Sequence, residues 1–412
     1  MAKRSNASYH DEGHVREYET KAGARWSYII RVPKDPDRPE LGTKYAESGG
    51  HLSEGAAYDA KAKALRERDR GLRVGSKTPT LQEFGEQWLN SLALSESTVG
   101  GYRRQLTRHV FPRIGDKPID QIKTTTLNEL YKTMETEPPL NVAETGRWSK
   151  ADPLGANSIS KIATTLGALF DAAVDDHHIL DNPGKGRRVK KPPKSKIVEQ
   201  APTMVVWNQQ QMTAFLVWLR DTRQDSDYTL WKMYAATGAR RSEILALRWS
   251  DIDFKNCRVH IRRTLNVDKP GHTKKPKNGK SRDFAVSEST IAALREWRKT
   301  LMALRGLNLA HGSAWVFPMV GDWERHRNPQ STSQMFQRRV EWAQKDLGVE
   351  ALPTIHLHEV RHSVATILIS EGTDPKTVSE RLGHESVRIT LDIYTHVTKK
   401  SDDAAAALLD FG

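Results

Sequence analysis

Four side chains between His356 and Val397 have the chemistry that transfer of a phosphoryl group needs: His358, Arg361, His384 and Tyr394. The planar, permanently charged guanidinium of an arginine can bind two phosphate oxygens at once. A tyrosine has a reference pKa of about 10 and becomes a useful nucleophile only beside a base and a positively charged phosphate site. Each of these residues alone is more often a core or surface residue, so the prediction depends on matching groups elsewhere in the chain.

Local signals indicate how these side chains are positioned. The three-residue spacing between the first histidine and the arginine places both on one face of a helix. Thr373 or Asp374 can cap the next helix, and Gly383 ends it, so that His384 lies in a loop. A last short helix over 388–397 then presents the tyrosine.

A second arginine is expected near this group. The sequence TGAR breaks a helical pattern and places Arg240 at the start of a new helix, where backbone N–H groups favour an anion. Residues 257–267 and 281–287 alternate as strands and are joined by a lysine-rich turn over 268–280. Helices over 290–304 and 329–348 lead back to the tyrosine region.

The first half of the chain has two different patterns. An alternating strand over 25–32, a possible second strand over 44–47 and a helix capped by Ser53 predict a small sheet-plus-helix module. Four helical patterns follow over 81–92, 95–115, 124–137 and 158–180, and we expect Pro112 and Gly115 to end the second. This region is predicted to be all α.

The composition indicates a polyanionic partner. Lys and Arg outnumber Asp and Glu by 64 to 51, which gives a net charge of +13. Nucleic acid is favoured over a membrane because no long apolar run is present. A single cysteine, Cys257, excludes a disulfide framework and a cysteine-based zinc module. The polar N-terminal residues predict no secretory signal, so we expect a cytosolic protein directed at nucleic acid.

The sharpest change in composition falls at 185–200, a predicted interdomain linker that Pro192 and Pro193 keep extended. Its basic side chains could follow a DNA backbone and gain affinity from counterion release, although a plain soluble tether is the alternative. The candidate DNA-binding residues are Lys185, Arg187, Arg188, Lys190 and Lys191.

Four segments in order resemble the signature sequences of the tyrosine recombinases, the phage-integrase type of site-specific recombinase: TGARRSEILALRWSDID, KNGKSRDFAV, HLHEVRH and LGHESVRITLDIYTH. The resemblance implies a multidomain, mainly α fold with small β-sheets. The implied parts are an arm-type DNA-binding module with a flexible N-terminal tail (1–75), an all-α core-binding domain (79–184), the basic linker (185–200), a mixed α+β catalytic domain (201–397) and a C-terminal tail helix (398–412).

The resemblance also implies a role for each site residue. Tyr394 is the nucleophile, Arg240 and Arg361 clamp the phosphate, and Glu243 supports the clamp. His384 adds a hydrogen bond to the phosphate and His358 takes the phenolic proton. Lys277 protonates the leaving 5′-oxygen, although Lys274, Lys275 and Lys280 are neighbouring alternatives for this role.

The resemblance implies no cofactor and no metal. A metal-dependent nuclease is less well supported, because Asp251 and Asp253 have no clustered carboxylates beside them. A zinc set made of His356, His358 and His362 is disfavoured, since their spacing does not place them on one helix face.

The leading hypothesis is an integrase that forms a 3′-phosphotyrosyl bond and integrates or excises a mobile element. The implied partners are core and arm attachment sites in double-stranded DNA, three further copies in a homotetramer, a DNA-bending host factor and a directionality factor. A Xer-like resolvase, a type IB topoisomerase and a DNA-binding regulator with a vestigial site are the alternatives. The apolar tail helix is expected to dock in a groove, either in cis or on a neighbouring protomer.

Overall fold

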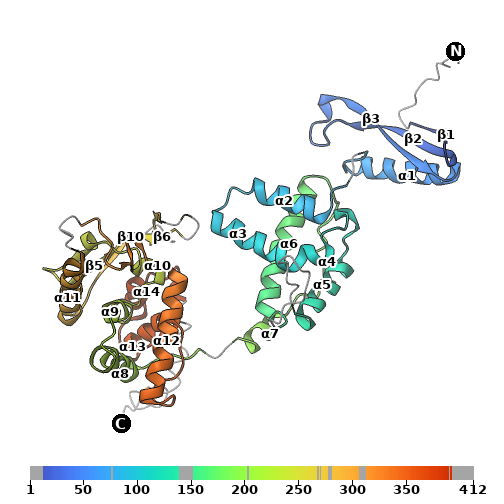
Figure 1. Ribbon diagram of the computed structural model, residues 1–412. Helices are drawn as coiled ribbons and strands as arrows, with labels where there is room; N and C mark the ends of the chain where they lie inside the picture. The colour runs from blue at the N-terminus through green and yellow to red at the C-terminus, as the bar shows by residue number, and fades with distance from the viewer. Residues whose placement is uncertain are drawn as a thin grey trace, which may run out of the picture. The chain divides into compact units, whose positions relative to one another are not determined.

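The computed structural model describes residues 13–75, 78–138, 152–201, 204–266, 269, 271–276, 281–305, 312–388 and 390–391. The chain divides into two compact units, Met1–Ala201 and Pro202–Gly412. In Figure 1 the first unit holds the elements labelled from β1 to α7, and the second holds those labelled from α8 to α14. Helices dominate and the sheets are small, as the sequence predicted.

The first unit begins with an antiparallel sheet of three strands in the order β1 (His14–Thr20), β2 (Gly23–Pro33) and β3 (Thr43–His51), with a single 3-10 turn (Pro39–Leu41) between the last two. Helix α1 (Glu54–Asp69) packs on one face, as Figure 1 shows, and Ser53 caps it as predicted. Alternate residues of β2 are buried against α1, including Ile30 and Val32. The sequence did not predict β1, because its polar residues lack the alternation that marks a half-buried strand.

An all-α cluster follows in the same unit. Its elements are α2 (Leu81–Ser91), α3 (Glu96–Gln105), a π-helical turn (Leu106–Val110), α4 (Phe111–Ile114), a 3-10 turn (Ile119–Gln121), α5 (Thr124–Thr136), α6 (Ala156–Asp175) and α7 (Lys194–Glu199). Thr80 and Glu83 form a capping box at the start of α2. The prediction that Pro112 ends a helix was wrong: it lies in the first turn of α4, where a proline needs no N–H partner.

The basic segment 185–200 follows the surface of this cluster. Asn128 Nδ2 donates to the Arg188 carbonyl at 2.9 Å, and the Lys190 N–H donates to Asn128 Oδ1 at 2.7 Å. The expectation of a fully extended segment was wrong at its end, because Pro193 is the N-cap of helix α7. A proline fits there for the same reason as in α4, since the first N–H groups of a helix have no partner within it.

Within its described residues, the second unit has a larger helical core and three small sheets. Its helices are α8 (Gln209–Val217, extended by a π-helical turn over Trp218–Thr222), α9 (Tyr228–Thr237), α10 (Arg241–Ile244), α11 (Glu288–Arg305), α12 (Pro329–Leu347), α13 (Leu357–Ser370) and α14 (Pro375–Leu382), with a 3-10 turn at Trp249–Asp251. Large aromatic side chains fill the core, among them Trp207, Phe215, Trp231 and Phe336.

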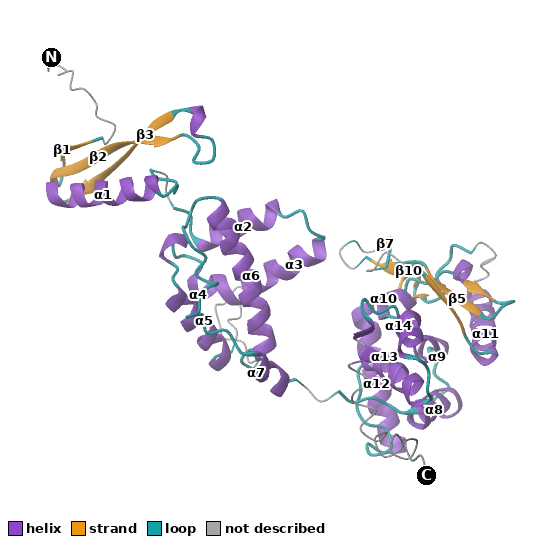
Figure 2. Ribbon diagram, turned by 180° about the vertical axis from the view of Figure 1, so that it is seen from behind, coloured by secondary structure: helices purple, strands orange, loops and turns teal. Residues whose placement is uncertain are grey.

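The sheets of this unit are antiparallel. One has the order β4 (Ile252–Asp253), β5 (Arg258–Ile261) and β8 (Arg282–Ala285); β6 (Thr264–Leu265) pairs with β7 (Thr273–Lys274), and β9 (Pro318–Met319) pairs with β10 (Asp322–His326). The strands lie to one side of the helices in Figure 2. The predicted strands correspond to β5, β6 and β8. Strands β4, β7 and β9 have two residues each and are too short to show a period, whereas β10 has five residues but only one apolar side chain, Trp323, and so shows no alternation.

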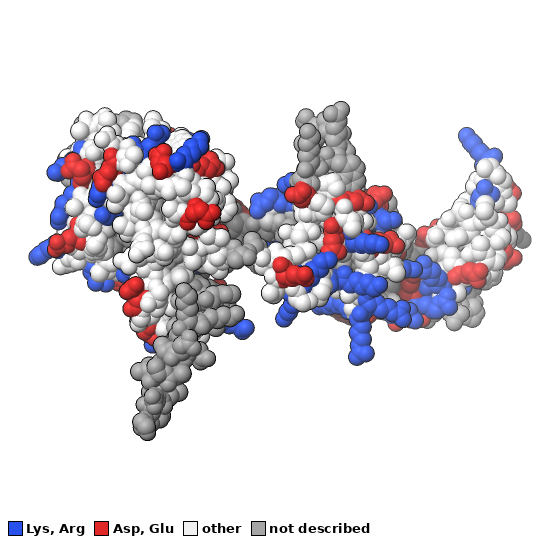
Figure 3. Space-filling view, turned by 90° about the horizontal axis from the view of Figure 1, so that it is seen from below, with Lys and Arg blue, Asp and Glu red and all other residues white. Residues whose placement is uncertain are grey.

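Charge is unevenly distributed over the face shown in Figure 3, where Lys and Arg side chains gather on the all-α cluster of the first unit. This concentration of positive charge favours binding of a polyanion, in agreement with the net charge of +13. No helix among the described residues has both the length and the apolar character that crossing a membrane requires.

Candidate active site

Arg240 lies at a sharp break between two helices. Helix α9 ends at Gly238, whose φ of 59° is left-handed, and a Cβ there would lie 2.5 Å from a methyl group of Leu382. Only glycine meets both constraints. Arg240 is the N-cap of α10, as the sequence predicted. Because α10 has a single turn, its dipole contributes little, and anion binding depends on the guanidinium.

Glu243 is the buried acid beside this arginine. Its side chain is 1% exposed and accepts hydrogen bonds from Arg240 Nη1 at 3.2 Å and from the Arg240 N–H at 2.8 Å. Arg282 grips the same carboxylate with both terminal nitrogens, at 3.1 and 2.6 Å. Burial alone would raise the pKa of Glu243, but the hydrogen bonds and charge of Arg282, helped by Arg240, hold it below its usual value. Glu243 therefore remains ionised.

Arg361 projects from α13 into the same region and is 5% exposed. Its Nη1 donates to the Gly238 carbonyl at 2.8 Å, whereas no acceptor among the described residues reaches its buried Nη2. Burial lowers the pKa of Arg361 to about 9, and the nearby charge of Arg240 acts in the same direction. An anion that bound here would satisfy the open donor and offset the repulsion between the guanidinium groups.

The loop after α14 completes this group. Asp374 caps the helix and Gly383 ends it in the left-handed conformation, both as predicted. The Gly383 carbonyl accepts from Arg240 Nη2 at 2.7 Å, which fixes the loop to the guanidinium. His384 is the next residue, and its N–H donates to the Ser379 carbonyl at 3.0 Å.

His384 is half-buried and hydrogen-bonded through one ring nitrogen. Its Nδ1 lies 2.8 Å from the hydroxyl of Thr390, which is fully buried. Burial lowers the pKa of His384 to about 4, and Arg361 and Arg240 add to the effect. The imidazole is thus neutral near pH 7, and its Nε2 remains to bind an anion. A neutral ring donates from Nε2 only when the Thr390 hydroxyl donates to Nδ1.

His358 lies one helical turn before Arg361 on α13. Burial lowers its pKa, and the charge of Arg361 lowers it further, so the ring is neutral and can accept a proton. Its ring meets that of His362 edge-on, with centroids 5.0 Å apart. His356 is instead the N-cap of α13, and its Nδ1 contacts Gln337 at 3.1 Å. Among the described residues, no three His, Cys, Asp or Glu side chains are placed to hold a metal ion.

The structure therefore brings together five of the predicted residues: Arg240, Glu243, His358, Arg361 and His384. Tyr394, Lys277 and the C-terminal tail lie outside the described residues, as does Lys280. Lys274 and Lys275 are both exposed.

The basic segment carries the other predicted residues. Lys185 forms an ion pair with Asp171 at 2.8 Å, and both side chains remain partly exposed. Arg187, Arg188, Lys190 and Lys191 are exposed. Their role in DNA binding stays a prediction.

Sequence reasoning missed Arg282 and Thr390. Arg282 shares a strand face with the buried Phe284, two residues later, so the alternation of β8 carried a signal for an arginine that points inward. Thr390 had no comparable signal, because its contact depends on how the loop after α14 folds back.

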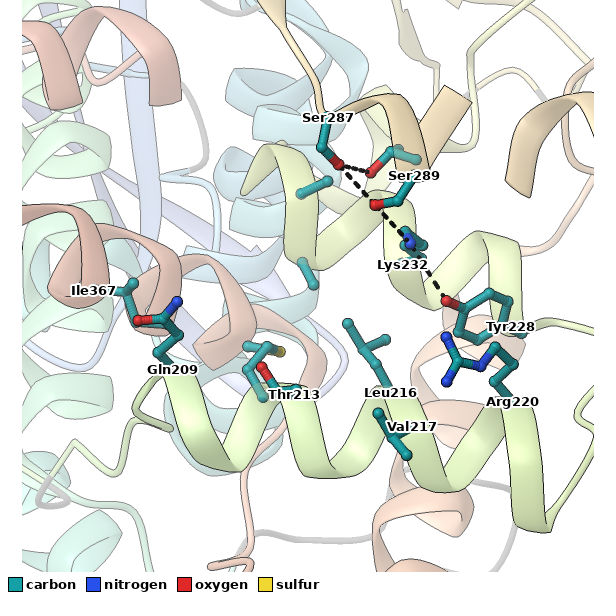
Figure 4. A pocket seen from close by; sticks show the side chains of 14 residues that line it. Gln209, Thr213, Leu216, Val217, Arg220, Tyr228, Lys232, Ser287, Ser289 and Ile367 are labelled. Atoms are coloured by element: carbon teal, nitrogen blue, oxygen red, sulfur yellow. Dashed lines mark hydrogen bonds between the residues drawn. The ribbon is translucent and has the colours of Figure 1, made fainter. Parts of the chain in front are cut away.

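A separate pocket of about 540 Å³ lies among α8, α9 and the start of α11. Figure 4 shows Lys232 between Tyr228 and Ser289, and its Nζ donates to their oxygens at 3.4 and 3.2 Å. Arg240, Arg282 and Arg361 do not line this pocket, so it is distinct from the site described above.

Two family models match the regions of the chain that contain these residues and the first part of the all-α cluster. The model of the phage integrase family matches residues 207–401, and that of the phage integrase N-terminal SAM-like domain matches residues 80–134. The ICEBs1 integrase of Bacillus subtilis is 28% identical over 265 residues, which make up 62% of this chain and 66% of that protein. The match thus spans slightly less than two thirds of that relative.

Two solved structures share the fold. The Tn1549 transposon integrase in complex with a circular intermediate DNA has a TM-score of 0.63 at 23% identity, over 81% of this chain and 100% of the other. A lambda integrase tetramer bound to a Holliday junction has a TM-score of 0.53 at 14% identity, over 92% of this chain and 94% of the other. At these identities the likeness establishes the fold alone.

The Thr390 contact leads to a test of the His384 tautomer. In Thr390→Val the shape is retained but the hydroxyl is lost, so we expect the Nε2-protonated tautomer to give way to a mixture of both. Side-chain ¹⁵N spectra of His384 at neutral pH report this directly. Thr390→Ser should keep the wild-type spectrum, and an unchanged tautomer in Thr390→Val would show that the hydroxyl does not set it.

Proposed function

Because the chain belongs to the phage integrase family, we propose that it is a site-specific DNA recombinase that integrates or excises a mobile element. It cleaves and rejoins DNA through a 3′-phosphotyrosyl intermediate. The observation that carries the proposal is the buried Nη2 of Arg361, which has no acceptor among the described residues, beside Arg240 and the neutral His384. A site with positive charge in excess and an unfilled donor is suited to a phosphodiester.

The two arginines stabilise the transition state. Charge accumulates on the non-bridging oxygens as the tyrosine attacks, and donors fixed in advance need no reorganisation at that moment. Arg240 is fixed by Glu243 and by the Gly383 carbonyl, and Arg361 by the Gly238 carbonyl. His384 adds a hydrogen bond from a neutral ring.

The proton balance closes with two further groups. The phenolic oxygen of Tyr394 bonds to phosphorus while the bond from phosphorus to the 5′-oxygen breaks. His358 takes the phenolic proton, because its lowered pKa leaves the ring neutral and able to accept one. Lys277 gives a proton to the 5′-oxygen. A second 5′-hydroxyl reverses the step, so neither ATP nor a divalent ion is needed.

The remaining parts of the chain bind DNA and further copies. We assign arm-site binding to residues 1–75, core-site binding to 79–184 with the basic segment 185–200, and cleavage to 201–397. The active assembly is a tetramer on two DNA sites, in which the tail over 398–412 docks on a protomer. A DNA-bending host factor and a directionality factor complete the complex, which acts on DNA in the bacterial cytoplasm.

Covalent capture tests the proposed chemistry. Incubated with a nicked suicide duplex that contains its core site, the protein should become linked to DNA in EDTA and without ATP. Denaturing gels measure the linked species. Tyr394→Phe should bind the same duplex and form no link, since phenylalanine lacks the attacking oxygen. Cleavage by Tyr394→Phe, or a requirement for Mg²⁺, would refute the mechanism.

The role of Lys277 has its own test. Lys277→Ala should cleave normal DNA slowly but recover on DNA with sulfur at the 5′-bridging position, because a thiolate leaves without a proton. Single-turnover cleavage rates on the two substrates give the comparison, with Lys274→Ala and Lys275→Ala as matched controls. Equal impairment on both substrates would assign proton donation to another residue.

A further inference from the structure

Arg282 is the first residue of β8, and it follows Lys277 in the chain by five positions. Strand β8 pairs with β5 in antiparallel register, with Arg282 opposite Ile261. The Arg282 side chain is only 12% exposed and points toward helices α10 and α14. It therefore connects the strand after the lysine-rich turn to the helices that hold the arginine cluster.

Every nitrogen of the Arg282 guanidinium has a protein acceptor. Nη1 and Nη2 each donate to a separate oxygen of Glu243, at 3.1 and 2.6 Å. Nε donates to the Arg381 carbonyl at 3.1 Å, in the last turn of α14. One side chain thus ties the buried acid of α10 to the end of α14, immediately before the loop that contains His384.

The fit around this guanidinium is close. A Cβ added to Gly383 would lie 2.8 Å from Nη1 and 3.0 Å from Cζ of Arg282. Gly383 also has a φ of 68°. Two constraints therefore require glycine at this position: the left-handed backbone and the close contact with the Arg282 side chain. The Gly383 carbonyl accepts from Arg240, and the two arginines therefore hold the same turn from different sides.

On this geometry we propose that Arg282 is a positioning residue for the phosphate clamp, the pair Arg240 and Arg361. It holds Glu243 and the His384 loop in a fixed position relative to Arg240 before DNA binds. The inference rests on the proposed function and adds a residue to it. We assign Arg282 no contact with the phosphate, since each of its three nitrogens already donates to a protein acceptor. Its place in β8 also links the clamp mechanically to the segment that contains Lys277.

Loss of Arg282 has a specific electrostatic consequence. Of the two arginines that bind Glu243, Arg240 alone would remain, while the carboxyl group would stay buried. Burial raises the pKa of a carboxyl group. A protonated Glu243 holds Arg240 less firmly. Cleavage should then require a higher pH than in the wild type, because the acid side of the pH profile follows ionisation of Glu243.

The test compares Arg282→Met with a matched control, Arg258→Met. Arg258 lies on the neighbouring strand and pairs with Asp283 in an exposed ion pair at 2.7 Å. We expect Arg282→Met to slow single-turnover cleavage by about 100-fold, the scale of a misplaced reacting group, while its affinity for the core site stays near the wild-type value. The acid side of its pH profile should move to higher pH. Arg258→Met should match the wild type in rate, affinity and profile.

Two further variants make the result decisive. Adding Glu243→Gln to Arg282→Met should remove the shift of the pH profile, because the titrating group is gone. Arg282→Lys keeps a positive charge but cannot reach both partners, so we expect slower cleavage with an unshifted profile. This variant decides the question if circular dichroism shows that Arg282→Met does not fold.

The outcomes separate this inference from the proposed function. If the wild type forms no covalent link to DNA, the proposed function fails. If the wild type forms the link and either Arg282 variant cleaves at the wild-type rate with the wild-type pH profile, the positioning role fails while the recombinase proposal stands.

Discussion

The rest of the site depends on one electrostatic constraint: guanidinium groups that repel each other are held together around a single buried carboxylate. Glu243 is 1% exposed and binds both Arg240 and Arg282, while Arg361 contributes a third positive charge nearby. One acid cannot neutralise three guanidinium groups, so the cluster keeps an excess of positive charge. The cluster therefore favours an anion, which in the proposed function is a phosphodiester.

Two glycines make this arrangement sterically possible. Gly238 and Gly383 both adopt left-handed conformations, and their carbonyls accept from Arg361 and Arg240 respectively. The chain turns sharply at each position, so that helix ends and backbone acceptors meet in a small volume. The two neutral histidines then line the same region without adding charge, because burial and the arginines lower their pKa values. Donors and charges fixed in advance in this way suit the stabilisation of a phosphoryl-transfer transition state.

Local sequence signals predicted the elements of this site but not all of its contacts. The TGAR break, the Asp374 cap and the Gly383 stop each act within one turn of helix, and all three predictions were confirmed. The contacts of Arg282 join residues 39 and 99 positions apart in the chain, and no local pattern fixes such a distance. Thr390 lies only six positions after His384, and it was missed because their contact depends on how the loop after α14 folds back. The edge strand β1 and the strands β4, β7, β9 and β10 were missed because pairing partners, and not their own periodicity, hold them in place.

The central claim is that Arg361 holds an open donor for the scissile phosphate, and a binding cycle tests it most directly. Affinity is measured for Tyr394→Phe, with and without Arg361→Ala, on a core site with either the native phosphate or a neutral methylphosphonate at the scissile position. Neutralising the phosphate should weaken binding about tenfold or more when Arg361 is present, as loss of a charged hydrogen bond does. It should have little further effect when Arg361 is absent. Equal losses in both backgrounds would contradict the account, because they would mean that Arg361 does not contact that phosphate.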